Sequence, residues 1–296
     1  DADSANWQTR QITGVAAGTT DTDAVNVAQL KQVAESSGDT TRYVSINSNE
    51  TGLRSNADND GATGLDAVAI GVYSRASGTE SSAVGYSNAG SGDFSLAIGV
   101  FNTASADFSS AVGYNNTASG SSSSAMGMGN TASGSSGSAV GSSNTASGSS
   151  SSAMGIGNRA LGNASSAVGL RNVALESSSS AIGVGNTASG SSGSALGSNN
   201  TALGFVSSAI GSSNTALANS SSAVGYDNAA SGSSSSAMGS GNGALVNDSS
   251  AIGSVNTASA SGSSAVGRSN KASGFFSSAM GFANIASGVA SSAMGI

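Results

Sequence analysis

Residues 138–169 decide the fold: SAVGSSNTASGSSSSAMGIGNRALGNASSAVG. Ala139, Ala153 and Ala167 stand 14 residues apart, and each is followed by an apolar residue and a glycine. The same Ala–apolar–Gly tripeptide begins at Ala69 and recurs without insertion or deletion to Ala293, in seventeen copies. A strict phase of this kind indicates a repeat architecture and argues against disordered low complexity, which imposes no phase.

The residues between the tripeptides predict a β-solenoid. Ser, Gly and Asn fill most of these positions and are poor helix formers. Each repeat divides into two short strands, Ser-Ser-Ala-Val-Gly and Asn-Thr-Ala-Ser-Gly, and Asn and Gly accept the left-handed backbone of tight corners. We therefore expect an all-β parallel β-roll in which each 14-residue repeat is one coil. At roughly 4.8 Å per coil, the roll is on the order of 80 Å long.

The alanine of each tripeptide is position 0, and later positions count from it. Position 7 is also alanine in every complete repeat except at Gly90, and position 1 is always apolar. A coil only two strands thick has no room for the position 1 side chains, so we expect the alanines inside and position 1 against other copies of the chain. The reverse orientation also obeys the strand period. The trimer contacts expected on this basis are Val140, Met154, Val168, Ile182 and Ile210.

The first 68 residues are made differently. Thr20-Asp21-Thr22-Asp23 fits a capping box that starts a helix. Val27, Leu30 and Ala34 follow at the spacing of a coiled-coil seam, which is too short to be stable without partner helices. We expect a neck and the start of a stalk over residues 1–35, a polar connector over 36–66, and the roll over 67–296.

Charge and composition exclude several functions. Residues 69–296 carry six acids and five bases, which gives no electrostatic footprint for nucleic acid. The chain has no histidine and no cysteine, so the many serines lack a base, and its carboxylates are mostly scattered. We expect no enzyme activity, no catalytic residue, no cofactor and no metal.

Two local motifs have simpler readings. Gly155–Ala160 matches a dinucleotide fingerprint but lacks the helix that this fingerprint requires, so a turn is favoured. Asn56, Asp58 and Asp60 copy half of a calcium loop, but Ala67 stands where a glutamate ligand belongs. An ordinary turn is favoured there as well.

The repeat Ser-Ser-Ala-Val-Gly-x-x-Asn-x-Ala-Ser-Gly resembles the head repeat of YadA-like trimeric autotransporter adhesins, whose period is also 14. Ile12–Thr19 and Thr22–Leu30 resemble the neck of that family, and Tyr43–Ser48 resembles its stalk-to-head connector. The resemblance implies a left-handed roll, a homotrimer, and display on a Gram-negative outer membrane for attachment to host cells or extracellular matrix.

No run of 18 apolar residues and no signal peptide is present, so we expect this fragment not to span a membrane and to be an excerpt of a longer chain. The family's C-terminal membrane anchor would lie outside it.

Departures from the repeat are where specific recognition could be encoded. The large or charged departures expected to form the ligand surface are Tyr86, Phe101, Tyr114, Arg171, Tyr226 and Arg268. The alternative is that the aromatic residues only shield the roll or a subunit seam.

A different class of function is ice binding by a flat solenoid, since threonine recurs at position 6. Arg159, Val173, Lys271 and Ile285 interrupt that row and argue against it.

Overall fold

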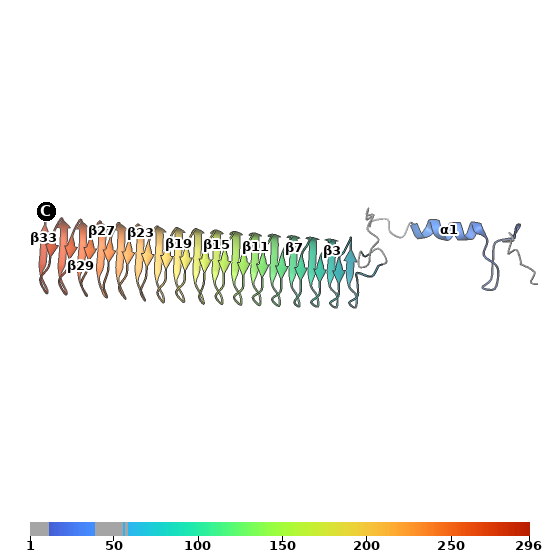
Figure 1. Ribbon diagram of the computed structural model, residues 1–296, viewed down its shortest axis with the longest axis horizontal. Coiled ribbons are helices and arrows are strands. Elements are labelled where there is room, and N and C mark those ends of the chain that lie inside the picture. The colour runs from blue at the N-terminus through green and yellow to red at the C-terminus, as the bar shows by residue number, and fades with distance from the viewer. Residues whose placement is uncertain (1–11, 39–55, 57–58) are drawn as a thin grey trace, which may run out of the picture. The chain divides into compact units, whose positions relative to one another are not determined.

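The computed structural model describes residues 12–38, 56 and 59–296, and the chain forms two compact units, Asp1–Asn49 and Glu50–Ile296. The second unit is a β-solenoid in which the strands stack in chain order along the roll, from β1 to β33 at the C-terminal end (Figure 1). The predicted fold class and the 14-residue coil are confirmed.

One sheet of the roll contains the Ala–apolar–Gly tripeptides. Each strand pairs in parallel with the strand 14 residues away, so Ala139 pairs with Ala153 and Val140 with Met154. Its seventeen strands are β1 (Val68–Ile70), β3 (Ser82–Tyr86), β5 (Leu96–Val100), β7 (Ser110–Tyr114), β9 (Ser124–Met128), β11 (Ser138–Ser142), β13 (Ser152–Ile156), β15 (Ser166–Leu170), β17 (Ser180–Val184), β19 (Ser194–Ser198), β21 (Ser208–Ser212), β23 (Ser222–Tyr226), β25 (Ser236–Ser240), β27 (Ser250–Ser254), β29 (Ser264–Arg268), β31 (Ser278–Phe282) and β33 (Ser292–Gly295).

The other sheet contains positions 6 and 7 of each coil and is only two residues wide. Its sixteen strands are β2 (Arg75–Ala76), β4 (Ala89–Gly90), β6 (Thr103–Ala104), β8 (Thr117–Ala118), β10 (Thr131–Ala132), β12 (Thr145–Ala146), β14 (Arg159–Ala160), β16 (Val173–Ala174), β18 (Thr187–Ala188), β20 (Thr201–Ala202), β22 (Thr215–Ala216), β24 (Ala229–Ala230), β26 (Gly243–Ala244), β28 (Thr257–Ala258), β30 (Lys271–Ala272) and β32 (Ile285–Ala286). A single bridge from Ala62 to Ala76 precedes this sheet, so pairing begins before residue 67.

The core of the roll consists of small side chains. From Ala76 to Ala279, every alanine at positions 0 and 7 has an exposed fraction of 0%. These alanines form one continuous buried cluster along the roll. The prediction that the two alanine rows meet inside the coil is confirmed. The roll is therefore only as thick as two small side chains between its sheets.

The buried asparagines at position 5 form a ladder that runs beside the two alanine rows. The Asn144 Nδ2 donates to Asn130 Oδ1 at 3.0 Å, to the backbone oxygen of Val140 at 2.9 Å and to that of Gly155 at 2.7 Å. The backbone N–H of Asn144 donates to the same Asn130 Oδ1 at 3.0 Å. The pattern repeats from coil to coil. Asparagine thus satisfies buried backbone groups at the corner that the sheet leaves unpaired.

The ladder ends with different residues at the N-terminal side of the roll. Ser74 stands at position 5 of the first coil, and its hydroxyl donates to the backbone oxygen of Gly85 at 3.0 Å. Asn56 Nδ2 donates to the backbone oxygen of Gly71 at 3.3 Å, the bond that a ladder asparagine would make. Asn56 therefore caps the first coil.

The prediction that asparagine takes up the left-handed backbone of the corners holds for Asn115 and Asn199 at position 4 and is wrong for the asparagines at position 5. The left-handed residues are those at positions 4 and 11, such as Ser143 (φ 56°) and Ser150 (φ 54°). The ladder asparagines follow the corner residue and do not adopt positive φ. Position 2 requires glycine. Gly141 has φ 118°, and a Cβ there would overlap the backbone oxygen of Gly155.

In the first unit, the helix α1 spans Val27–Gly38. The predicted capping box at Thr20–Asp23 is wrong as a helix start, because these residues form a turn in which the Asp23 N–H donates to the Thr20 oxygen at 3.0 Å. Asn26 caps the helix instead. The Gln29 N–H donates to Asn26 Oδ1 at 3.0 Å, and the Asn26 N–H donates to Gln29 Oε1 at 3.3 Å.

Gln29 also ties the loop before the helix to its first turn. Its Oε1 accepts from the Gly18 N–H at 2.9 Å, and its Nε2 donates to the Gly18 oxygen at 3.0 Å. The motif Tyr43–Ser48 lies outside the described residues. Over the part of the chain that the structure describes, no helix has both the length and the apolar character needed to cross a membrane.

Candidate functional site

The outer face of the first sheet carries an unbroken apolar row. Because positions 0 and 1 alternate across the strand, burying the alanines turns every position 1 side chain outward. Between Ile98 and Met280 along the chain, the larger members stay well exposed, with exposed fractions of 37–44%. Valines in the row, such as Val84, are half-buried. We call these residues the position 1 row.

The expected trimer contacts are members of this row. Val140, Met154, Val168 and Ile182 are direct partners on β11, β13, β15 and β17, and Ile210 lies on β21. Met154 is 43% exposed, and Ile182 and Ile210 are 40% exposed. Their side chains therefore lie in one line on one face, which is the arrangement that an interface between copies requires.

Aromatic side chains gather at one corner of the first four coils. Tyr73, Tyr86, Phe101 and Tyr114 follow one another with ring centroids 5.8, 5.4 and 6.1 Å apart. Each ring is turned by 83–89° from its neighbour. Tyr86, Phe101 and Tyr114 are 42%, 45% and 51% exposed. We call these four residues the aromatic ladder.

The structure thus brings together three of the six expected ligand residues. Sequence reasoning missed Tyr73, which stands at position 4 of the first coil. The signal that could have found it is the alternation of aromatic residues between positions 3 and 4 in successive coils. Position 3 of one coil and position 4 of the neighbouring coil lie close enough for their rings to contact each other.

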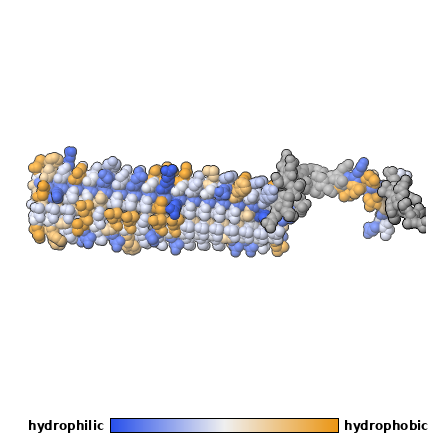
Figure 2. Space-filling view, viewed as in Figure 1, coloured by the Kyte–Doolittle hydropathy of each residue, from blue (hydrophilic) through white to orange (hydrophobic). Residues whose placement is uncertain are grey.

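The other three expected ligand residues are separate. Arg171, Tyr226 and Arg268 are exposed on coils far along the roll from Tyr114. The guanidinium of Arg268 lies over the ring of Phe282 at 5.8 Å from its centroid, so this cation already has an aromatic partner in its own chain. Figure 2 shows hydrophobic groups at intervals along one face of the roll, with pale surface between them.

The opposite corner of the roll has its own aromatic pair. The rings of Phe94 and Phe108 stack at 4.9 Å between centroids with 2° between planes. Beside them, Asp93 Oδ1 accepts from the Thr79 N–H at 2.8 Å and Asp107 Oδ1 from the Asp93 N–H at 3.0 Å. These carboxylates pair with backbone amides of the preceding coil, which agrees with their being edge residues.

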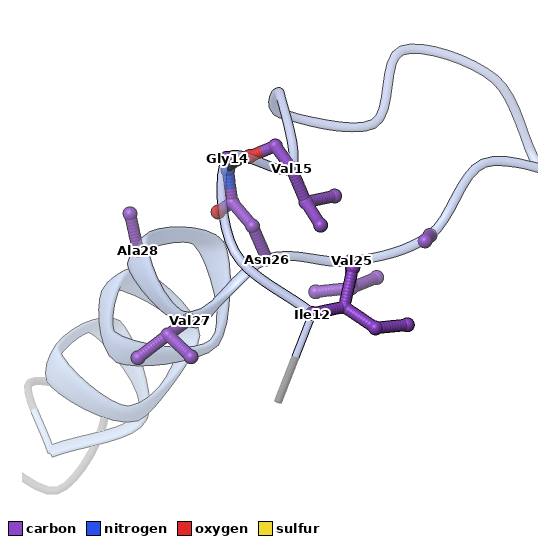
Figure 3. A pocket seen from close by; sticks show the side chains of 8 residues that line it. Ile12, Gly14, Val15, Val25, Asn26, Val27 and Ala28 are labelled. Carbon is purple, nitrogen blue, oxygen red and sulfur yellow. Dashed lines mark hydrogen bonds between the residues drawn. The ribbon is translucent and has the colours of Figure 1, made fainter. Parts of the chain in front are cut away.

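The first unit exposes apolar side chains around a small pocket of about 450 Å³. Ile12, Val15, Val25 and Val27 are among its lining residues, and Figure 3 shows Ile12 and Val25 close together at its edge. Ile12 is 83% exposed. A short helix with its apolar residues uncovered is typical of a segment that packs against partner helices.

The threonines of position 6 lie on the outer face of the second sheet, where Thr117, Thr131 and Thr145 are direct partners. The exposed Arg159 continues the line after Thr145. A long cationic side chain breaks the flat, regular surface that ice matching requires.

Within the described residues, no group of three or more His, Cys, Asp or Glu side chains could hold a metal ion. Asn56 caps the roll, and Asp58 of the calcium-like motif lies outside the described residues. Gly155–Ala160 runs from β13 into β14 without a helix, so it offers no helix N-terminus to a pyrophosphate.

Two family models match the chain. One, described as the coiled stalk of trimeric autotransporter adhesin, matches residues 11–52. The other, described as the YadA head domain repeat, matches residues 62–88, 91–116, 146–172 and 202–228. Together the matched ranges cover about half of the chain. No curated protein matches it at a significant level.

Proposed function

Because the chain belongs to the YadA-like trimeric autotransporter adhesins, we propose that it is a rigid homotrimeric rod that attaches a Gram-negative bacterium to host cells or extracellular matrix. That family is one of structural adhesins and not of enzymes. The partners proposed here are two further copies of the chain and a host surface component.

The position 1 row is the observation that carries the proposal. The alanines fill the inside of the roll, so no space remains there for seventeen larger apolar side chains. A continuous apolar row along one face is expected to be covered by a partner of equal length. Identical copies arranged around an axis parallel to the roll supply such a partner at every coil.

The neck supports the same assembly independently. Val27 and Leu30 of α1 are 68% and 62% exposed within one chain. Three copies of the helix would cover these side chains at a common seam. Because a 12-residue helix is marginal alone, this association would also stabilise α1 itself.

We propose residues 1–35 as neck and start of the stalk, 36–66 as connector, and 67–296 as head. The bridge between Ala62 and Ala76 adds the end of the connector to the first coil. The proposed location is the bacterial cell surface, with anchoring in the outer membrane by a C-terminal region outside this sequence.

Adhesion of the full chain to host cells and matrix-coated surfaces tests the proposal. We expect saturable binding that needs the trimer, because three sites on one particle raise a weak affinity about 10²-fold or more. Binding should fall when the exposed ligand residues are changed to serine together, and little when one is changed. The set is Tyr86, Phe101, Tyr114, Arg171, Tyr226 and Arg268.

The matched control changes Thr117, Thr131 and Thr145 to serine, which alters the outer face of the second sheet. Trimer content and melting temperature must be equal in all preparations. Full adhesion by the six-residue variant would contradict the assigned surface, and no adhesion by the unaltered trimer would contradict the function.

A further inference from the structure

Charge is separated between the two edges of the roll, which follow and precede each strand of the first sheet. One edge comprises positions 3–6 and carries all five bases of residues 69–296, namely Arg75, Arg159, Arg171, Arg268 and Lys271. The other edge comprises positions 9–11 and carries five of the six acids, namely Glu80, Asp93, Asp107, Glu176 and Asp248. Asp227 at position 4 is the exception. We call them the basic edge and the acidic edge.

Opposite charges on the two edges share levels along the roll. Arg75 and Glu80 both belong to coil 1, and Arg171 and Glu176 both belong to coil 8. All four side chains are exposed within one chain. Because the members of each pair lie on different edges, one edge of a copy is complementary in charge to the other edge of an identical copy.

Aromatic side chains of coils 2–4 occupy both edges at the same level. Tyr86, Phe101 and Tyr114 of the aromatic ladder lie on the basic edge, and the stacked pair Phe94 and Phe108 lies on the acidic edge of coils 2 and 3. These five side chains have exposed fractions of 42–59%. Exposed aromatic groups of this size are typical of interaction surfaces.

A second aromatic group repeats this arrangement near the C-terminal end of the roll. Arg268 and Phe282 form their cation–π contact on the basic edge of coils 15 and 16. Phe275 and Phe276 lie on the acidic edge of coil 15 and are 57% and 70% exposed. Residues 115–204 contain no aromatic residue. The two aromatic groups therefore stand apart, and each occupies both edges.

Cyclic symmetry brings the two edges together at matching levels. A rotation about an axis parallel to the roll keeps every coil at its own level and joins two different surfaces of neighbouring copies. When the position 1 row faces the axis, the two ends of each strand of the first sheet point towards the two neighbours. The basic edge of one copy then meets the acidic edge of the next.

We propose that neighbouring copies of the chain meet edge to edge in this way, with aromatic seams at coils 2–4 and 15–16 and an ion pair between Arg171 and Glu176 of adjacent copies. This inference rests on the proposed homotrimer and names the surfaces that join its copies. Phe205 and Tyr226 have no aromatic counterpart at their own level and take no part in the seams.

Cysteine cross-linking of the full chain tests the seams, because the chain has no cysteine of its own. Phe101→Cys combined with Phe108→Cys places one thiol on each edge of coil 3, and Arg171→Cys combined with Glu176→Cys does so on coil 8. With a short bis-maleimide, both double variants should give covalent dimers and trimers on denaturing gels. The single variants should give none.

The matched control combines Phe101→Cys with Asp248→Cys, which uses the same two edges ten coils apart, or roughly 48 Å along the roll. It should give no covalent trimer. A trimer in solution that is cross-linked at neither matched level, or equally well in the control, would overturn the seams and leave the homotrimer standing. A monomeric unaltered chain would contradict the homotrimer itself.

A pair outside the proposed ligand surface separates a seam from a host-binding site. Phe94→Ser with Phe108→Ser should raise the dissociation constant of the trimer about tenfold or more, because both rings lose their cover in the next copy. The control Phe205→Ser, on the same edge, should leave that constant unchanged. Circular dichroism checks that the roll stays folded.

The ladder residues are shared between the proposed ligand surface and the proposed seam. Changing Tyr86, Phe101 and Tyr114 to serine together should weaken the trimer as the phenylalanine pair does. An unchanged trimer with reduced adhesion would instead assign these rings to the host ligand and overturn the seam at coils 2–4.

Discussion

The asparagine ladder predicts a large difference between two adjacent asparagines. Asn200 is fully buried in the ladder, whereas Asn199 is exposed at the corner with φ 54°. Asn200→Ala removes the Nδ2 bonds to Asn186 Oδ1 (3.1 Å), to the Leu196 oxygen (2.7 Å) and to the Gly211 oxygen (2.8 Å). It also removes the acceptor of the Asn214 N–H and Nδ2, both at 3.0 Å.

The magnitude follows from the groups left unpaired. A buried donor without a partner costs about 1–3 kcal/mol, and the lost bonds to carbonyl oxygens cost about 1 kcal/mol each. Asn200→Ala should therefore lower the free energy of unfolding by about 3–5 kcal/mol per chain. Asn199→Ser places a residue common at this corner and should cost less than about 1 kcal/mol.

Denaturant unfolding followed by circular dichroism measures both variants against the unaltered chain. Amide hydrogen exchange should in addition show faster exchange near the altered coil, because each coil of a solenoid contacts only its neighbours. Equal destabilisation by Asn200→Ala and Asn199→Ser would refute the view that the buried ladder stabilises the roll.

Gly141→Ala should destabilise the roll far more than Gly157→Ala. A Cβ added at Gly141 overlaps the Gly155 oxygen, whereas a Cβ added at Gly157 lies 3.6 Å from Arg171 Cγ. Thermal unfolding of the two variants checks this difference. Asp23 accepts hydrogen bonds first from the Thr19 N–H and also from the Thr20 N–H, which lowers the pKa of its carboxyl. Its contribution to the neck turn should be present at neutral pH and disappear as the pH falls through that lowered pKa. Amide chemical shifts of Thr19 and Thr20 should follow this titration and be altered at all pH values by Asp23→Asn but little by the control Asp21→Asn.

The alanine core could be predicted from side-chain volume, although the strand period by itself also allows the reverse orientation. Alanine at positions 0 and 7 is small enough to meet across two strands, while Val, Ile or Met at position 1 is not. The 14-residue period predicts the length of one coil, and the side-chain volumes predict which residues lie inside the coil and which lie outside. The exposure of the position 1 row then follows from strand alternation.

The role of asparagine could not be read from its residue type, which suits both a left-handed corner and a bond to backbone groups. A signal was nevertheless present. Position 5 stays asparagine in fifteen copies and is never glycine, whereas position 4 varies among Gly129, Arg171 and Val255. A corner position tolerates such variation, while a buried side chain with several bonds does not.

The helix start was mispredicted because two capping patterns lie six residues apart. Thr20–Asp23 and Asn26–Gln29 both have the spacing of a capping box. Only the second is followed directly by helix, and in the first the Asp23 side chain accepts from the Thr20 N–H without helix propagation. The sequence prediction of the ligand surface contains three members of the aromatic ladder and lacks Tyr73, which stands at position 4 of the first coil.

The mass of the chain in solution tests the central claim most directly, namely that the position 1 row joins copies of the roll. Sedimentation equilibrium should give three times the chain mass of 27.8 kDa. Replacing Val140, Met154 and Val168 together with Asp should release monomers or unfold the roll, and replacing Thr117, Thr131 and Thr145 with Asp on the opposite sheet should leave the trimer intact. A stable monomer of the unaltered chain, or a trimer that survives the first replacement, would contradict the account.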